Sequence, residues 1–406
     1  MRRTLLLVAA LLALPLAPAA AQDRWVVRTE PGTPVVAVEV LVAAGPADED
    51  TAQAGVAYLA ARTVVEPIRH ALDSLGARLT LQAHKDALSF TLTAAPDAWE
   101  DAARVLLVAL FRDPPAPAEI ERQRRVVLAE LRAREANPAD ALGRETDRAL
   151  FGERHPWGRP AVGSAATVQR LSTQQVDDFL RTTVVPERAL LALVGPVRRA
   201  SADALFTPFF PPGPLPVAEP MPPTPADSVL RRDYNSITTW IAAVYPFPAS
   251  ADVEALGMLA DAAAEMLEFS AARRSVYDVR AEVLARRGGG ELRLQMVVPP
   301  EEAEAWAQRM RGVVASFADP SPAASARFRE QLRHYRGVRL LSLETPEARA
   351  RELARQYLRT GLASIILTLV DGLTGDRLAA ASRALPEPLV VFLGPFYETP
   401  QGKAAP

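Results

Sequence analysis

The chain has 406 residues, of which 49% are hydrophobic and 23% charged, a balance typical of globular rather than disordered proteins. This length predicts two domains with enough core to fold without disulfides. The chain has no cysteine, which excludes disulfides, thiolate metal sites and a lipidated N-terminal cysteine. Lys and Arg total 46 against 48 Asp and Glu, so there is no basic excess and we expect no nucleic-acid partner.

The first 21 residues have the pattern of a secretory signal peptide. Arg2 and Arg3 form a charged start, 4–16 an apolar run, and 19–21 an A-x-A-type cleavage site, with cleavage expected after Ala21. The apolar run is too short and too interrupted by proline to favour a membrane-spanning helix. We therefore expect an exported protein, periplasmic or extracellular, with no membrane span once the signal is removed.

The first half of the chain then combines strands with amphipathic helices. The sequence pattern predicts strands over 35–42 and 190–197, a helix over 54–65, two strands over 77–94 with a break near Lys85, and helices over 99–111 and 117–135. Strands and helices that do not alternate strictly favour a layered α+β sandwich.

The second half repeats this pattern after a proline-rich segment. Nine prolines between 207 and 225 predict an extended linker, because proline is excluded from helix interiors and central strands. The runs LLALVGPV and LVVFLGPF place Gly195 and Gly394 199 positions apart, and each run follows a helix-start signal, at Ser172 and at Thr374. Each half also opens with a strand-like run, the second over 236–244. A duplicated α+β unit explains these similarities.

We therefore predict two homologous α/β-sandwich domains in tandem, each with a mixed sheet covered by helices. The predicted boundaries are 1–21 for the signal peptide, 22–206 for the N-terminal domain, 207–227 for the linker, 228–398 for the C-terminal domain and 399–406 for a tail.

The run GVAYLAART, at 55–63, is the most informative motif of the chain. It resembles the Gly-Leu-Ala-His-Phe-Leu-Glu-His-Met signature of the insulinase/pitrilysin metallopeptidases, whose H-x-x-E-H helix holds zinc. Tyr58 stands at the first His, Ala61 at the Glu and Arg62 at the second His. A guanidinium never ligates zinc, a phenol rarely does, and an alanine cannot take a proton from a metal-bound water.

The resemblance covers almost the whole chain after the signal peptide. The segment 120–138 resembles the family's helix with the third zinc ligand, whose position falls on Glu130, although the spacing from Arg62 is several residues shorter than usual. The segments 155–163 and 341–361 resemble further family segments in the same order. The resemblance implies a degenerate member with no catalytic residue, no metal and no cofactor, in which Tyr58, Ala61, Arg62 and Glu130 are vestigial positions.

A second family motif is also altered. Active members hold the substrate backbone with an Arg and a Tyr in the second domain. Tyr277 falls on the Tyr and is the implied substrate-binding residue, whereas Ser270 stands at the Arg. Arg273 or Arg274 is the alternative, acting from a shifted position.

The remaining candidate residues predict structure rather than chemistry. The four histidines, at 70, 84, 155 and 334, include no pair at i, i+3 or i, i+4, so no helix offers two imidazoles on one face. We expect His84 on a strand surface and His155 as the cap of a turn. The segment 48–50 is expected to be a solvated loop whose acidic charge is favourable at the N-terminus of the next helix.

At the vestigial site, the sequence leads to one geometric hypothesis. Tyr58 and Arg62 are four residues apart and so share a helix face. Glu130 lies close to the apolar side of its own helix, where carboxylates are normally paired. We expect Arg62 to donate a charge-assisted hydrogen bond to Glu130, with Tyr58 as a second donor, in place of the metal.

The family packs four such domains around a closed chamber, from one long chain or two short ones. The resemblance therefore implies a heterodimer with an active homologue that has an intact H-x-x-E-H motif. This chain would form half of the chamber wall for peptides, which would bind largely by strand addition. Two alternatives stay open: a structural or assembly protein with no peptidase partner, and an independent peptidase with an unrecognised site.

Overall fold

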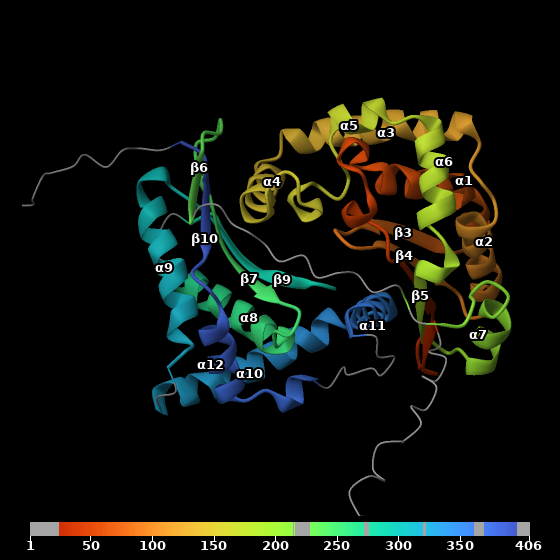
Figure 1. Ribbon diagram of the computed structural model, residues 1–406. Helices are drawn as coiled ribbons and strands as arrows, with labels where there is room; N and C mark the ends of the chain where they lie inside the picture. Colours follow the sequence, from red (N-terminus) through yellow and green to blue (C-terminus); the bar gives the residue numbers. More distant parts are fainter. Residues whose placement is uncertain are drawn as a thin grey trace, which may run out of the picture.

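The computed structural model describes residues 24–213, 215, 228–271, 276–319, 322–360 and 369–395. Two α/β units follow one another along the chain, each built on a five-stranded mixed sheet with helices packed against it (Figure 1). This confirms the predicted fold class. The predicted signal peptide, most of the linker and the tail lie outside the described residues.

The two units have the same strand order. The elements of the first unit are β1 (Trp25–Thr29), β2 (Val36–Val42), α1 (Val56–Ser74), β3 (Arg78–Ala83), β4 (Leu88–Ala94), α2 (Trp99–Phe111), α3 (Pro117–Glu135), α4 (Pro138–Phe151), α5 (Ala165–Arg170), α6 (Thr173–Thr183), β5 (Ala189–Gly195) and α7 (Arg199–Phe206). Its strand order is β1-β5-β2-β4-β3, with β1 parallel to β5 and the other pairs antiparallel.

The second unit repeats this arrangement. Its elements are β6 (Val229–Arg232), β7 (Thr239–Pro248), α8 (Val253–Ala271), β8 (Asp278–Arg286), β9 (Gly289–Val298), α9 (Ala303–Ser316), α10 (Pro322–Ser342), α11 (Pro346–Thr360), α12 (Gly375–Ala384) and β10 (Leu389–Leu393). The order β6-β10-β7-β9-β8 matches the first sheet strand for strand. Gly195 is the last residue of β5 and Gly394 directly follows β10; their φ values are 149° and 145°, and a Cβ on either would lie 2.7 Å from a backbone oxygen. The duplication seen in the sequence is therefore structural.

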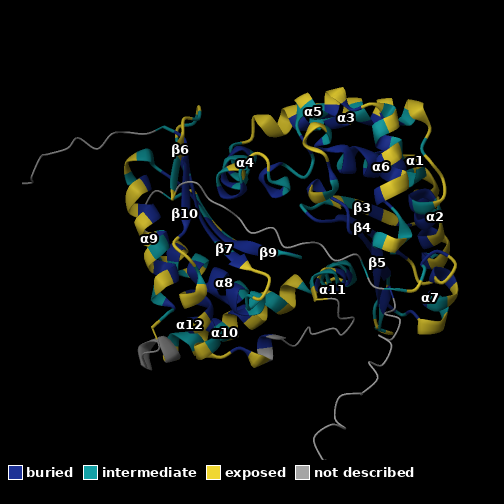
Figure 2. Ribbon diagram, in the orientation of Figure 1, coloured by how far each residue is buried: buried dark blue, intermediate teal, exposed yellow. Residues whose placement is uncertain are grey.

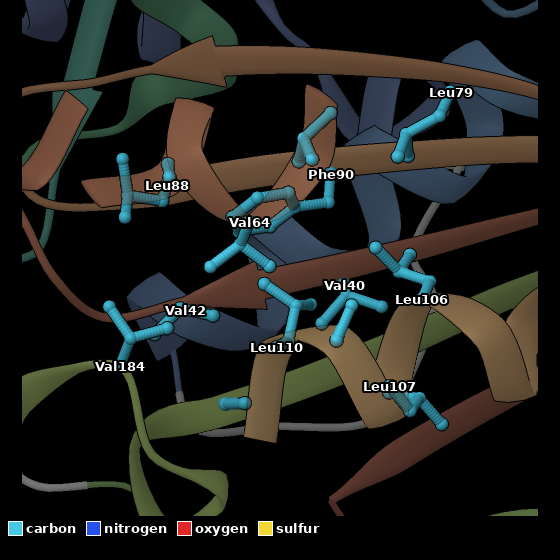
Figure 3. Close-up of a cluster of buried hydrophobic side chains, with 14 of the residues drawn as sticks. Val40, Val42, Val64, Leu79, Leu88, Phe90, Leu106, Leu107, Leu110 and Val184 are labelled. Atoms are coloured by element: carbon cyan, nitrogen blue, oxygen red, sulfur yellow. The ribbon is translucent and has the colours of Figure 1, made fainter. Parts of the chain in front are cut away.

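Each sheet is buried on both faces. Alternate residues of β2 point to opposite sides, so Val40 and Val42 pack with α1 and α2 while Ala37 and Leu41 pack on the other side. Figure 3 shows the first of these layers, with Val64 of α1 close to side chains of the sheet and of α2. Because both faces are covered, β2 is apolar at nearly every position instead of alternating.

The second cover of each sheet comes from the other unit. The helix α11 packs on β2 and β5 of the first sheet, where Leu353 and Tyr357 are buried against Leu41 and Val194. In return, α4 packs on β7 and β10 of the second sheet. Figure 2 shows the strands of both sheets buried between helices, with α11 lying between the two units. The two units therefore complete each other's cores.

Two elements differ from the predictions. The helix predicted over 54–65 continues to Ser74 as α1, past Pro67, because Leu72 is buried in the core. The linker predicted from 207 starts with buried side chains, since Phe209 and Phe210 pack into the first unit. Among the described helices, none is long and apolar enough to cross a membrane.

Candidate functional site

The helix α1 positions three of the four residues predicted to be vestigial, and a glycine and a carboxylate fix its start. Gly55, with φ of 95°, precedes the helix, and a Cβ there would lie 2.8 Å from the oxygen of Val162. The carboxylate of Glu49 accepts hydrogen bonds from the N–H groups of Gly55 and Ala57, both at 3.0 Å. These bonds satisfy backbone N–H groups at the start of the helix that have no partner within the helix itself.

Glu49 corrects the prediction of a solvated loop. Its exposed fraction is only 7%, because it is folded under the first turn of α1. Burial raises the pKa of Glu49 to about 7, even though the hydrogen bonds from Gly55 and Ala57 and the charge of Arg159 lower it. Of the predicted acidic loop, 48–50, only Asp50 is exposed.

Three of the four vestigial positions lie together, and the fourth is in the core. Ala61 is completely buried against the first sheet, so it offers no group to a site. Tyr58 and Arg62, one turn apart, lie at the edge of the buried face of α1 and are partly exposed. The helix α3 packs against α1 through Ile120 and Val127, which brings Glu130 opposite Tyr58 and Arg62.

The hydrogen bonds expected between these residues are present. Arg62 Nη1 donates to Glu130 Oε1 at 2.9 Å, and Tyr58 Oη donates to Glu130 Oε2 at 3.0 Å. Arg62 Nη1 also lies 3.4 Å from Tyr58 Oη. One side chain from α3 is thus held by two side chains from α1, with the guanidinium as the cation of the site.

Two further residues complete this network and were missed in the sequence. Gln123 is buried and accepts from Arg62 Nη2 at 3.4 Å, and Glu66 Oε1 lies 3.3 Å from Arg62 Nε in an ion pair without hydrogen-bond geometry. The spacing in the sequence could have indicated both residues. Glu66 is four residues after Arg62, and Gln123 is seven residues before Glu130, so each lies on the same side of its helix as that residue.

The residues at this position do not fit zinc. Burial raises the pKa of Tyr58, and the charge of Glu130 raises it further, so the phenol is protonated at neutral pH and is a donor rather than a ligand. Arg62 is a permanent cation that is already paired with the carboxylates of Glu130 and Glu66, so a metal ion there would be repelled. Among the residues that the structure describes, no three His, Asp or Glu side chains gather as a metal site.

The residues predicted to correspond to the family's substrate-binding Arg and Tyr lie in the second unit or outside the described residues. Tyr277 precedes β8 with a side chain that is 64% exposed, and its N–H donates to the oxygen of Val297 at 2.9 Å. Ser270, in the last turn of α8, donates to the oxygen of Met266. Arg273 and Arg274 lie outside the described residues. Within the described chain, no hydrogen bond joins Tyr277 to the Tyr58–Arg62–Glu130 cluster.

The sequence predicted structural positions for His155 and His84, and the structure agrees with the prediction for His155 only. His155 Nδ1 accepts from the N–H of Trp157 at 3.0 Å, which is the turn cap expected from the sequence. His84 is not a simple surface residue, because it is partly buried and its Nε2 lies 2.9 Å from Arg355 Nη2 of the second unit. The sequence could not show this contact, which joins residues 271 positions apart.

Comparison by sequence relates the chain to zinc proteases over part of its length. No family model matches the chain. An uncharacterized zinc protease of Mycobacterium leprae is 29% identical over 189 residues, which is 44% of this chain and 42% of that protein. The match therefore spans less than half the length of such curated relatives.

Comparison by structure covers nearly the whole chain. The crystal structure of a peptidase M16 inactive domain from Pseudomonas fluorescens has a TM-score of 0.78 at 19% identity, covering 92% of this chain and 95% of that one. A chain of complex III2 from Candida albicans, with Inz-5 bound, has a TM-score of 0.72 at 13% identity, covering 91% and 93%. At these identities the likeness shows a shared two-domain fold.

Proposed function

Because this chain is an insulinase/pitrilysin-like member of the M16 peptidase family, we propose that it is a catalytically silent subunit that pairs with an active, zinc-bearing homologue. The observation that carries the proposal is the Arg62–Glu130 hydrogen bond of 2.9 Å at the metal position. A guanidinium there keeps the link between α1 and α3 that the metal would supply, without its chemistry. The fold is thus kept for a purpose other than hydrolysis by this chain.

The proposed purpose is to form half of a peptide-binding chamber. The strand β3 is at the edge of the first sheet, and its residues alternate between buried and more exposed positions. An edge strand can pair with an extended peptide through backbone hydrogen bonds, which needs no catalytic group. One carbonyl of β3, that of Leu79, already accepts from Arg69 at 3.2 Å, so peptide pairing would use the rest of the strand.

The second candidate is a structural or assembly protein with no peptidase partner. Ser270 favours it, because its hydroxyl is bound to its own helix and cannot replace an arginine that holds substrate backbone. The likeness to a chain of complex III2 fits either candidate, since it concerns the fold alone. For both candidates we propose an exported, periplasmic or extracellular protein, on the pattern of residues 1–21.

Co-expression with a homologue that has an intact H-x-x-E-H motif tests the proposal. We expect the two chains to co-elute as a heterodimer on size-exclusion chromatography. We also expect their interface to bury well beyond ~1,600 Å² in total, as obligate interfaces do. Peptide hydrolysis should need the partner's motif, and a partner with its Glu replaced by Gln is the control. Separate elution of the two chains at micromolar concentration would favour the assembly protein instead.

A further inference from the structure

A cavity of about 470 Å³ lies between the two units. Its walls include the turn between β3 and β4, the end of the β8–β9 hairpin, and one side of α11, and none of its described lining residues belongs to the Tyr58–Arg62–Glu130 cluster. Figure 1 shows α11 between the two sheets, where it separates the units. This volume is in the range of small-ligand sites.

The cavity wall is rich in cations. Among its described lining residues, seven are Lys or Arg and four are Asp or Glu. Lys85 and Arg293 share Asp147, at 2.9 and 2.8 Å, and Arg339 donates to Glu352 at 2.6 Å. Arg339 Nε also lies 3.4 Å from Glu254 Oε1, so these three cations face three carboxylates within the wall, those of Asp147, Glu254 and Glu352.

Two more cations lie near carboxylates at the hairpin. Arg286 makes two hydrogen bonds to the buried carboxylate of Glu291, at 2.5 and 3.1 Å. The backbone N–H of Arg287 donates to Asp86 Oδ2 at 3.1 Å, and its guanidinium lies 3.4 Å from the backbone carbonyl oxygen of Asp86. Burial lowers the pKa of Arg287, and the charge of Asp86 opposes this effect. The remaining two cations of the wall lie on α11.

These two cations are Arg355 and Arg359, for which no carboxylate lies within 4.0 Å among the described residues. They are four residues apart, so they point to the same side of α11. The nearest polar partner of Arg355 is His84, at 2.9 Å. Burial and the charge of Arg355 lower the pKa of His84 to about 4, so the imidazole is neutral and accepts without cancelling charge.

We infer that this cavity binds the carboxylates of an acidic peptide segment between the guanidiniums of Arg355 and Arg359. A guanidinium fork matches a carboxylate in a bidentate pair. On an extended peptide, side chains of one face are about 7 Å apart, which is close to the spacing of i, i+4 residues on a helix. His84 directly follows β3, so a peptide paired with that edge would reach the cavity. That the ligand is a peptide rests on the proposed function, whereas the inference that the site binds anions rests on the charges that line the cavity.

Calorimetric titration of residues 22–406 with an N-acetylated, amidated hexaglutamate tests the inference without any partner subunit. We expect binding that weakens between 50 and 200 mM salt, and none with hexaglutamine. The variant Arg355→Gln/Arg359→Gln should bind at least ~10-fold more weakly, while Arg355→Lys/Arg359→Lys, which keeps the charge, should lose less. A matched control is Arg132→Gln/Arg134→Gln, which removes two exposed arginines from α3 and should bind as the wild type does.

Three results would overturn the inference. The first is equal hexaglutamate affinity in the wild type and in Arg355→Gln/Arg359→Gln. The second is equal loss of affinity in the α3 control, which would indicate general charge attraction. The third is binding of pyrophosphate without hexaglutamate, which would make the site one for phosphate. Thermal unfolding of each variant checks that a lost affinity is not a lost fold, and the lysine variant provides a second reading if the glutamine variant unfolds.

Discussion

At the scale of single residues, the Tyr58–Arg62–Glu130 cluster has a guanidinium as its cation. Arg62 is 16% exposed and Glu130 is 36% exposed in their side chains, so water screens the pair in part. The sequence predicted this contact because a known signature aligned Tyr58, Arg62 and Glu130. It could not predict Gln123 or Glu49, whose burial depends on how α3 and the 46–53 segment fold over α1.

The substitution Arg62→Ala measures what the contact contributes. Because Glu130 is about one-third exposed, we expect a loss of about 1–2 kcal/mol in the free energy of unfolding, between the values for surface and buried pairs. Arg69→Ala, on the same helix and paired with Glu66, is the control and should cost about 0.5 kcal/mol or less. Urea denaturation measures both, and equal losses would show that Arg62 is an ordinary surface residue.

At the scale of elements, most strands and helices followed from the sequence, and the exceptions have clear causes. The bounds of α2 and α3 were predicted, because their apolar residues recur at helical spacing and Pro117 starts α3. The end of α1 was not predicted correctly, because proline usually ends a helix. Here Pro67 lies on the exposed side, and burial of Leu72 keeps the following turns helical.

The start of α1 should make stability depend on pH. The pKa of Glu49 is raised from 4.5 to about 7 in the folded state. The contribution of Glu49 to the free energy of unfolding is therefore fully present below pH 4.5 and is lost as pH rises through 7. Relative to Glu49→Gln, which stays neutral, the wild type should lose about 2–3 kcal/mol of unfolding free energy between pH 5 and pH 8. Urea denaturation at both values measures this, and a constant difference would contradict the account.

At the scale of the whole molecule, the two units exchange helices. Repeated runs in the sequence predicted the duplication, and the two sheets confirm it. The exchange of α4 and α11 could not be predicted, because a helix that covers a distant sheet has the same apolar pattern as one that covers its own. For the same reason the cavity and the contact of His84 with Arg355 were beyond sequence reasoning.

This exchange predicts that neither unit folds alone. Residues 22–213 without α11 would expose Leu41, Leu190 and Val194, which are fully buried in the chain. We expect each unit alone to lack a cooperative unfolding transition, because this apolar surface would meet water. A full chain cut at a protease site inserted between 215 and 228 is the control and should stay associated. Cooperative unfolding of residues 22–213 alone would contradict the prediction.

The central claim is that Arg62, not zinc, is the cation of the site, and metal analysis of the purified chain tests it most directly. After incubation with excess zinc and gel filtration, the wild type should retain far less than one zinc per chain. Tyr58→His/Arg62→His should gain zinc, because two imidazoles one turn apart would face Glu130, whereas Arg62→His alone should gain little. Retention of about one zinc per wild-type chain, with chelator-sensitive peptide hydrolysis, would contradict the account.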